Sequence, residues 1–503
     1  MSKSNRIIRN TIYLYAKSII SMTIMLFVTR IVLHSLGVID YGIYNVIAGS
    51  IAILGFLRNS LAITMQRFLN HYQGEGDIIK QEQVFNIGIV FHWSAATLLV
   101  FLFIILGFYL FDGVLSIPFD RLDASKIVYL CLVINTFITV ISAPYDATIT
   151  SHENMLFYSI VGIVESIAKL MVALFIDTLH GDRLIIYSVL MMGVPAIEVL
   201  TMRIYCKLKY RECTFRPFSC WDSQLASNMI NFAGWSLVGA STNVISNHGA
   251  NLALNHYFGA AINAVVGIAN QIQGVLAVLL TGMLKSLTPV IFKSEGTGNI
   301  NEMLKMSMLG CKYSTMLFSF LAIPVFIQAP SLLQLWLGEV PEWTTLFVRL
   351  QILRALFEQL GSSMMNPLNA TSHVKVVNIA AIFYNITPLF ILISMYQHGY
   401  SPFWHYIIMI IFLTFGQNFI IFYLCYKYFS FKFTIYIKKV LVPCLITIAV
   451  SFLFGLFSSI ITTGIIGIIL TGVCTSITFI IVVWLVSDIN EKTIVLDKIK
   501  KYI

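Results

Sequence analysis

Long runs of apolar residues, each about the length of a membrane-spanning helix, dominate the pattern along this 503-residue chain. A bilayer core about 30 Å thick is crossed by roughly 20 apolar residues in an α-helix. The pattern predicts an all-α polytopic membrane protein of about fourteen transmembrane helices, with no room for a sizeable soluble domain. The predicted spans begin near Thr11, Gly42, Val84, Lys126, Met155, Arg183, Gln224, Ala260, Glu302, Trp343, Val374, Pro402, Tyr436 and Thr462.

Lys and Arg residues are concentrated before the first span and in polar segments that follow an even number of spans. Lys3, Arg6 and Arg9 precede the first span, five Lys and Arg residues fill 203–216, and further lysines follow the twelfth span and end the chain. Acidic residues such as Asp40 occupy the alternate loops. Because cytoplasmic loops are enriched in Lys and Arg, we predict that both termini are cytoplasmic. The net charge of +9 therefore requires no nucleic-acid partner.

The chain also contains an internal repeat. Residues 10–18 (NTIYLYAKS) are similar to residues 228–236 (NMINFAGWS), and the Leu36-Gly37 and Phe258-Gly259 pairs follow at similar distances. Parallel repeats with a substrate site between them are a common plan among transporters. The repeat predicts two six-helix lobes related by a pseudo-two-fold axis, plus two C-terminal helices. The predicted parts are an N-terminal lobe 1–208, a basic cytoplasmic linker 209–223, a C-terminal lobe 224–430, and 431–503 with the last two spans and a cytoplasmic tail.

Three short motifs carry a family resemblance. Leu36-Gly-Val-Ile-Asp-Tyr-Gly-Ile-Tyr-Asn-Val46 resembles the SLG-x-x-(D/E)-(Y/F)-G signature of bacterial polysaccharide flippases of the Wzx type. Leu335-Trp-Leu-Gly-Glu-Val-Pro341 is similar to the LWLG-x-x-P of the same group, and Asn369-Ala-Thr-Ser372 to its A-T-G turn, with Ser372 in place of Gly. The group belongs to a superfamily that also contains multidrug extruders of the MATE type and the lipid II flippase.

The resemblance implies a function as well as a fold. The substrate would be an undecaprenyl-diphosphate-linked oligosaccharide, moved from the cytoplasmic to the outer leaflet of the bacterial inner membrane during surface-polysaccharide synthesis, for example of O-antigen. The partners would be this lipid-linked oligosaccharide, membrane lipids and the polysaccharide polymerase machinery. A monomer without cofactor or enzymatic activity is expected.

Charged residues inside the predicted spans are the first candidates for a substrate site. A charge at the bilayer centre costs about 2.5–3.5 kcal/mol on insertion scales, so such residues face a wet cavity or a partner. Lys17 and Arg30 lie on the first span and Arg58 on the second, with no acidic residue on either span. We expect this cationic series to bind a diphosphate, because a guanidinium group can donate two parallel hydrogen bonds to phosphate oxygens. Essential arginines of the lipid II flippase occupy places similar to Arg30 and Arg58. The alternative is that Arg30 and Lys17 snorkel to the interfaces.

Two further pairs of oppositely charged residues each lie on a single predicted helix. Glu165 and Lys169, and likewise Arg354 and Glu358, are four residues apart and would meet on one helix face. The simpler interpretation is an intrahelical ion pair that lowers the cost of insertion. The alternative interpretation makes Glu165, Glu358 and Arg354 candidates for ion coupling.

A row of amides marks the seventh span. Asn243, Asn247, Asn251 and Asn255 are spaced four residues apart and form one polar stripe along a helix. Such a stripe either joins helices by hydrogen bonds or forms a track for sugar hydroxyls, since amides both donate and accept hydrogen bonds. We therefore keep Asn243, Asn247 and Asn251 as candidate substrate-binding residues.

Several functions are disfavoured by what the sequence lacks. It contains no G-x-x-x-x-G-K-[ST] phosphate loop and no H-E-x-x-H, and its cysteines lack zinc-ligand spacing, so no metal or cofactor is expected. A cation-coupled MATE-type extruder, the main alternative, would need acidic residues in its cavity, and spans 1, 2, 7 and 8 have none. A membrane-embedded glycan polymerase or ligase would need a large exterior loop. A non-transporting scaffold would leave the intramembrane arginines without a role.

Overall fold

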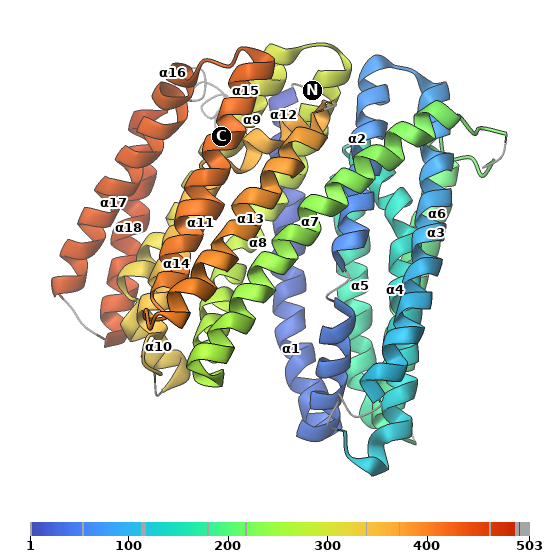
Figure 1. The fold of residues 1–503 in the computed structure, drawn as a ribbon, viewed down its shortest axis with the longest axis horizontal. Coiled ribbons are helices and arrows are strands. Elements are labelled where there is room, and N and C mark those ends of the chain that lie inside the picture. Colours follow the sequence, from blue (N-terminus) through green and yellow to red (C-terminus); the bar gives the residue numbers. More distant parts are fainter. Residues whose placement is uncertain are drawn as a thin grey trace, which may run out of the picture. The chain divides into compact units, whose positions relative to one another are not determined.

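The computed structural model describes residues 3–52, 55–111, 117–178, 181–216, 219–338, 340–371, 373–461, 464–487 and 492. Across these residues the chain is helical, and no strand occurs in them. Eleven helical stretches in the described residues are long and apolar enough to cross a membrane. Figure 1 shows their order along the chain. They lie in α1 (Lys3–Ala52), α3 (Ile78–Tyr109), α4 (Leu122–Ser151), α5 (Met155–Phe175), α6 (Arg183–Lys209), α8 (Ala260–Gly296), α9 (Ile300–Ile327), α13 (Val374–Gln397), the continuous stretches Trp404–Phe429 and Phe433–Ile461, and α18 (Gly464–Val486).

The three remaining predicted spans are helical but more polar or shorter. They correspond to α2 (Gly55–Glu75), α7 (Ser223–Phe258) and α11 (Thr344–Gln359). α11 has only 16 residues and is followed, after a break near Gly361, by the short helix α12 (Met365–Ala370). These three helices carry Arg58, the amide row and Arg354, so the least apolar spans are the ones that hold most candidate site residues.

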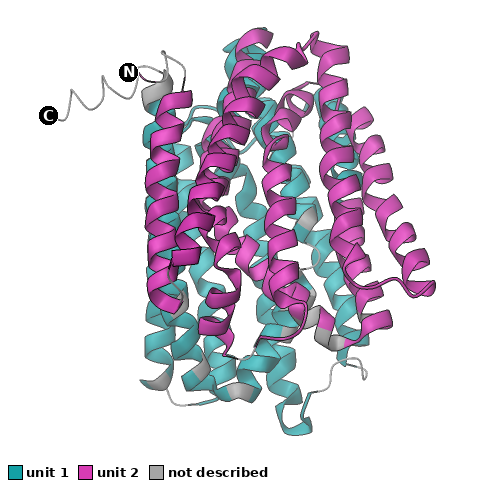
Figure 2. Cartoon of the chain, turned by 90° about the vertical axis from the view of Figure 1, so that its left-hand side faces the viewer, with its two compact units in different colours: residues 1–240, 288–299 teal, residues 241–287, 300–503 magenta. Residues whose placement is uncertain are grey.

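Two compact units make up the described structure, and Figure 2 colours them separately. Unit 1 comprises residues 1–240 and 288–299, and unit 2 comprises residues 241–287 and 300–503. The units follow helix packing, so parts of α7 and α8 belong to each of them. The lobe boundaries predicted from the sequence repeat therefore stay a prediction.

The core of unit 1 is built by α1, α3, α4 and α6. Fully buried Val32, Ile47, Phe103 and Val128 belong to one apolar cluster in this unit. α4 packs against α3 and α6, and α1 packs against α5. The outer faces of these helices expose large apolar side chains, as expected where lipid rather than water surrounds them.

Unit 2 has its own core, and a helical hairpin is attached to it. Phe318, Phe347, Leu392 and Tyr406 are almost fully buried in the main apolar cluster of the unit. α17 (Val442–Ile461) and α18 pack against each other and against α9. Gln328 fixes this attachment, because its side-chain amide donates to the Thr471 hydroxyl at 2.8 Å. These two helices are the predicted C-terminal pair.

The backbone confirms the predicted repeat. Gly37 interrupts α1 with φ of 78°, and Gly259 separates α7 from α8 with φ of 80°. Gly76 and Gly298, which follow the ends of α2 and α8, also have positive φ, at 77° and 70°. Such φ values favour glycine because it has no Cβ. Each repeat thus starts and ends its second predicted span with a glycine turn.

The first motif contributes a clasp at one end of unit 1. Arg121, at the start of α4, donates from Nε to Asp40 at 2.8 Å and from Nη1 to Asp182 at 2.7 Å. Asp182 also accepts from the backbone amides of Leu184 and Ile185, and so caps α6. Asp40 of the signature therefore ties α1 to the starts of α4 and α6. Glu339 and Ser372, in the other two motifs, lie outside the described residues.

Candidate functional site

Arg58 of α2 has a carboxylate partner that the sequence analysis missed. Its Nη2 lies 3.7 Å from Oδ2 of Asp146 on α4, and the Arg58 side chain is 41% exposed. No acidic residue was expected on the helix of Arg58, and its counter-charge comes instead from a third helix. The pair is long and half open, so the guanidinium keeps donors for another anion.

Lys17 of α1 is also held inside unit 1. Its ammonium group lies over the Tyr158 ring of α5, 4.5 Å from the ring centroid. The lysine side chain passes directly over Gly162, where a Cβ would overlap it. This contact is a cation–π interaction, and it draws Lys17 towards α5 rather than to the end of α1.

Three acidic residues share the electrostatic environment of Lys17 and Arg58. Glu165 and Lys169 of α5 form the predicted intrahelical pair at 2.5 Å. Glu198 of α6 interacts electrostatically with both of them, with Lys17 and with Asp146. Unit 1 thus contains a polar network of Asp146, Glu165 and Glu198 with Lys17, Arg58 and Lys169. Sequence reasoning missed Asp146 and Glu198, although a list of all acidic residues within the spans would have included both.

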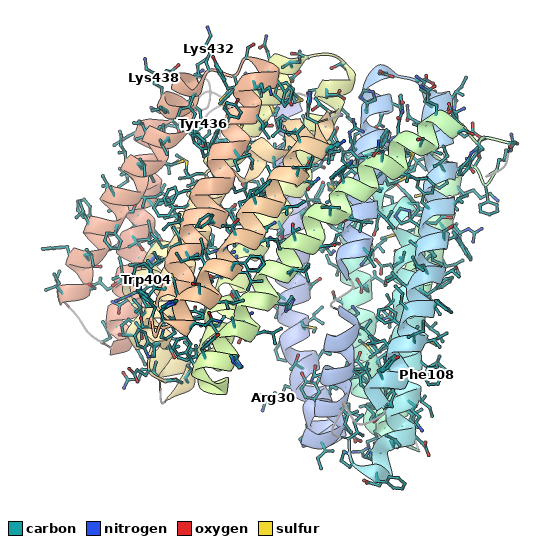
Figure 3. The ribbon with its side chains drawn as sticks, viewed as in Figure 1. Arg30, Phe108, Trp404, Lys432, Tyr436 and Lys438 are labelled. Carbon is teal, nitrogen blue, oxygen red and sulfur yellow. The ribbon has the colours of Figure 1, made fainter. Side chains whose placement is uncertain are left out.

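Arg30 lies apart from this network. It projects from α1 at the end of unit 1 where Phe108 of α3 also lies (Figure 3). Its side chain is exposed, and it forms no ion pair or hydrogen bond with another described residue. Arg30 and Arg58 share no ion-pair or hydrogen-bond partner among the described residues.

The amide row on α7 is bonded along its own helix. Asn247 donates from Nδ2 to the Asn243 carbonyl at 2.9 Å and to its side-chain oxygen at 3.2 Å. Asn243 is exposed and Asn251 is half-buried, whereas Ala250 and Leu254 on the same helix enter the core of unit 2. The row therefore points away from that core. The side chain of Asn255 lies outside the described residues.

The second predicted intrahelical pair does not form. Arg354 and Glu358 of α11 are not within ion-pair distance of each other in the described structure, and Glu358 is exposed. The buried Nε of Arg354 has no hydrogen-bond partner within the described structure. By contrast, Arg349 donates to the carbonyls of Phe326 and Ile327 at 3.1 and 3.3 Å, where α9 ends. That position suits a cation, because the helix dipole is negative there.

One end of unit 1 contains a dense ionic cluster centred on Glu153. The Glu153 side chain is 2% exposed. Its Oε2 lies 2.7 Å from Nε of Arg6, and its Oε1 lies 2.9 Å from Nζ of Lys293. Nearby, His71 of α2 contacts Glu295 of α8. Gly296 lies so close to the His71 backbone that a Cβ there would overlap its carbonyl. The ends of α2 and α8 are thus locked together by charges and by backbone contact.

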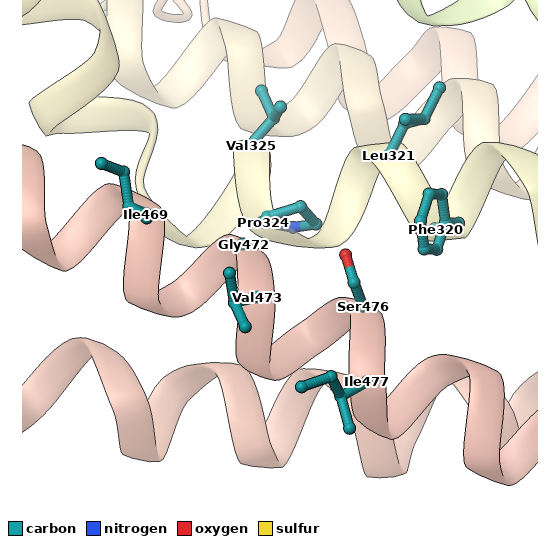
Figure 4. Close-up of a pocket in the computed structure, with 9 residues that line it drawn as sticks. All are labelled: Phe320, Leu321, Pro324, Val325, Ile469, Gly472, Val473, Ser476 and Ile477. Carbon is teal, nitrogen blue, oxygen red and sulfur yellow. The ribbon is translucent and has the colours of Figure 1, made fainter.

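A groove on the side of unit 2 has a different character. It has a volume of about 530 Å³ and lies between α9 and α18. Figure 4 shows its lining, which is apolar apart from Ser476. None of the described residues that line the groove is charged, so it is unsuited to an ionic head group. Among the described residues there is also no cluster of three or more side chains able to hold a metal ion.

Comparison with known proteins gives a clear result for the fold alone. No protein-family profile and no curated protein matches the chain. Among solved structures, a point mutant of a MATE transporter has a TM-score of 0.70 at 12% identity, covering 86% of this chain and 99% of the other. A point mutant of the Vibrio cholerae MATE transporter VcmN has a TM-score of 0.65 at 17% identity, covering 84% and 96%.

A third similar structure is described by the charge of its pocket. It is a MOP superfamily transporter from Pyrococcus furiosus, for which reverse polarity of the binding pocket suggests a different function. Its TM-score is 0.70 at 12% identity, covering 86% of this chain and 98% of the other. The chain therefore has the fold of the MATE and MOP superfamily transporters.

Proposed function

We propose that this protein is a transporter that flips an undecaprenyl-diphosphate-linked oligosaccharide from the cytoplasmic to the outer leaflet by alternating access. The observation that carries the proposal is a set of loosely held cations among the membrane helices. Arg30 is unpaired with any described residue, Arg58 is held only at 3.7 Å, and Lys17 is held by an aromatic ring. A diphosphate is the ligand that such groups suit.

The described contacts suggest how the substrate would be handled. Arg58 would exchange its long contact with Asp146 for phosphate oxygens, assisted by Arg30 and Lys17. The Asn243, Asn247 and Asn251 amides would meet sugar hydroxyls, while the polyprenyl chain stays in the lipid. Glu165 would serve ion coupling, with Asp146 and Glu198 as neighbouring carboxylates. Glu358 and Arg354 remain coupling candidates on α11.

The proposed setting follows from the same substrate. The protein would lie in the bacterial inner membrane as a multi-pass monomer with both termini in the cytoplasm, next to the polysaccharide polymerase machinery. No enzymatic activity and no nucleic-acid partner are proposed.

A cation-coupled MATE-type extruder is the second candidate, and two observations favour it. The similar solved structures are mostly described as MATE proteins. Asp146, Glu165 and Glu198 also supply the interior acidic residues that the sequence analysis found lacking on spans 1, 2, 7 and 8. These carboxylates could bind a proton, a sodium ion or a cationic drug.

One experiment separates the two candidates. Cells lacking the protein receive the wild type, Arg58→Ala or Arg58→Lys, and an impermeant glycan-modifying reagent reports which leaflet holds the lipid-linked oligosaccharide. We expect accumulation in the cytoplasmic leaflet without the protein and with Arg58→Ala, and less accumulation with Arg58→Lys. If the leaflet distribution never changes while drug tolerance falls, the flippase proposal is wrong and the extruder is favoured.

A further inference from the structure

Arg354 is a half-buried cation for which the described part of unit 2 provides no counter-charge. It lies on α11, about 15 Å along the helix from Thr344 at 1.5 Å per residue. Its Nε is buried and has no hydrogen-bond partner in the described part of the chain. The described part of unit 2 contains three acidic residues, Glu302, Glu342 and Glu358. The first two precede or begin helices at the ends of the unit, and Glu358 is exposed and unpaired with Arg354.

The helix α11, which carries Arg354, packs against α14 (Trp404–Met409) and the π-helical turn η5 (Ile410–Gly416). Phe347 lies two turns before Arg354 and packs edge-on against the Tyr406 ring, with the ring centroids 5.0 Å apart. The charge of Arg354 acts on both His405 and Tyr406. α11 and α14 are neighbours in Figure 1, and α11 also contacts η5.

Several polar atoms on these elements are buried and unsatisfied. Among the described residues, His405 Nδ1, the Tyr406 hydroxyl and the Thr414 hydroxyl find no hydrogen-bond partner, and these three residues are 4%, 1% and 1% exposed. The oxygen of Gln351, one turn before Arg354, is also unsatisfied. Burying such groups without a partner is costly, so several together on neighbouring elements require an explanation.

Thr414 illustrates how the local backbone produces this arrangement. Several other buried threonines donate to the carbonyl four residues earlier, as Thr315 does to Cys311 at 2.7 Å and Thr447 to Pro443 at 2.8 Å. Thr414 lies in the π-helical turn and makes no such bond. π-helical turns occur frequently at functional sites, and here the turn leaves a hydroxyl donor available.

We propose that unit 2 contains a binding site for a small inorganic anion the size of chloride, formed by Arg354 of α11 with His405, Tyr406 and Thr414. All four side chains can donate a hydrogen bond, and Gln351 can turn its amide nitrogen towards the same place. A cation inside the membrane needs a neutralising partner, and an anion supplies it where the chain does not. A monatomic anion suits the site because it needs donors but no large cavity.

The full-length protein in detergent, at constant ionic strength with gluconate replacing chloride, provides the test. Binding of radioactive chloride is measured by scintillation proximity, and the melting temperature is recorded in both salts. We expect saturable binding and a higher melting temperature in chloride for the wild type. Arg354→Met should weaken binding about tenfold or more, and Tyr406→Phe, which keeps the ring, by up to about tenfold.

Arg349→Met is the matched control, because Arg349 is on the same helix but already has carbonyl partners. It should lower stability and leave chloride affinity unchanged. Absence of saturable chloride binding to the wild type would overturn the proposal. Equal losses of affinity in Arg349→Met and Arg354→Met would also overturn it. So would loss of the chloride effect in Glu358→Gln but not in Arg354→Met, since the effect would then not depend on the Arg354 cation.

Discussion

Individual charges in unit 1 are held mainly by partners from other helices. Lys17 rests on Tyr158, Arg58 reaches Asp146, and Arg121 joins Asp40 to Asp182. In a medium without water each such contact replaces hydration, and its loss leaves a charge exposed to lipid or apolar protein. Lys17 and Arg58, which we propose to bind the substrate, are therefore also expected to support folding, and variants must separate the two roles.

The Arg121 clasp allows a structural role to be measured on its own. Arg121→Gln removes a guanidinium that grips two carboxylates, so we expect a loss of about 2 kcal/mol and a lower melting temperature in detergent. Arg121→Lys should recover only part of it, because an ammonium cannot bond two carboxylates in pairs. Full stability of Arg121→Gln would show that Asp40 and Asp182 do not depend on it.

Asp146 allows a functional role to be measured. Asp146→Asn removes the negative charge near Arg58 while keeping a similar shape. A flippase should keep or increase its binding of a diphosphate lipid, because the guanidinium loses its competitor. An extruder that needs this carboxylate should lose transport of cationic drugs by about tenfold or more. Binding assays with the diphosphate lipid and uptake assays with a cationic dye distinguish the two outcomes.

Glu212 gives the described structure a defined dependence on pH. It lies in the polar segment after α6, where burial acts to raise its pKa, but the contact with His152 outweighs this and lowers the pKa below its ordinary value. The carboxylate thus stabilises the fold above the pKa of the unfolded chain. This stabilisation is lost as pH falls through the folded pKa. We expect the melting temperature to fall by a few degrees on acidification, and Glu212→Gln to flatten that dependence.

At the scale of elements, the meeting of α2 and α8 is the contact most sensitive to a small change. A Cβ on Gly296 would overlap the His71 carbonyl, so Gly296→Ala should force the two helix ends apart. We expect weaker transport and faster proteolysis near residues 293–299. Gly274→Ala on the same helix is the control, because no atom of the described residues beyond its own helix turn lies within 4 Å of the Cβ it would add. Equal effects of the two variants would contradict the importance of this contact.

Elements also show why part of the site was predictable. The Glu165–Lys169 pair lies on one helix, and its spacing alone places the two side chains together. The Arg58–Asp146 pair joins helices far apart in sequence, and nothing in a single sequence indicates which helices touch. The unpaired state of Arg354 was missed for a related reason, since its rotamer and the π-helical turn depend on packing. Span lengths were predictable because bilayer thickness fixes them.

At the scale of the whole molecule, the distribution of basic and aromatic residues predicts which end of the helices faces the cytoplasm. In unit 2, Lys432 and Lys438 lie at one end of the helices and Trp404 at the other (Figure 3). If both termini are cytoplasmic, a cysteine replacing Glu342, in the loop before α11, should react with an impermeant maleimide in intact cells. A cysteine replacing Lys432 should react only after permeabilisation. The opposite pattern would invert the topology, and the proposed direction of glycan transport would then have to be reversed.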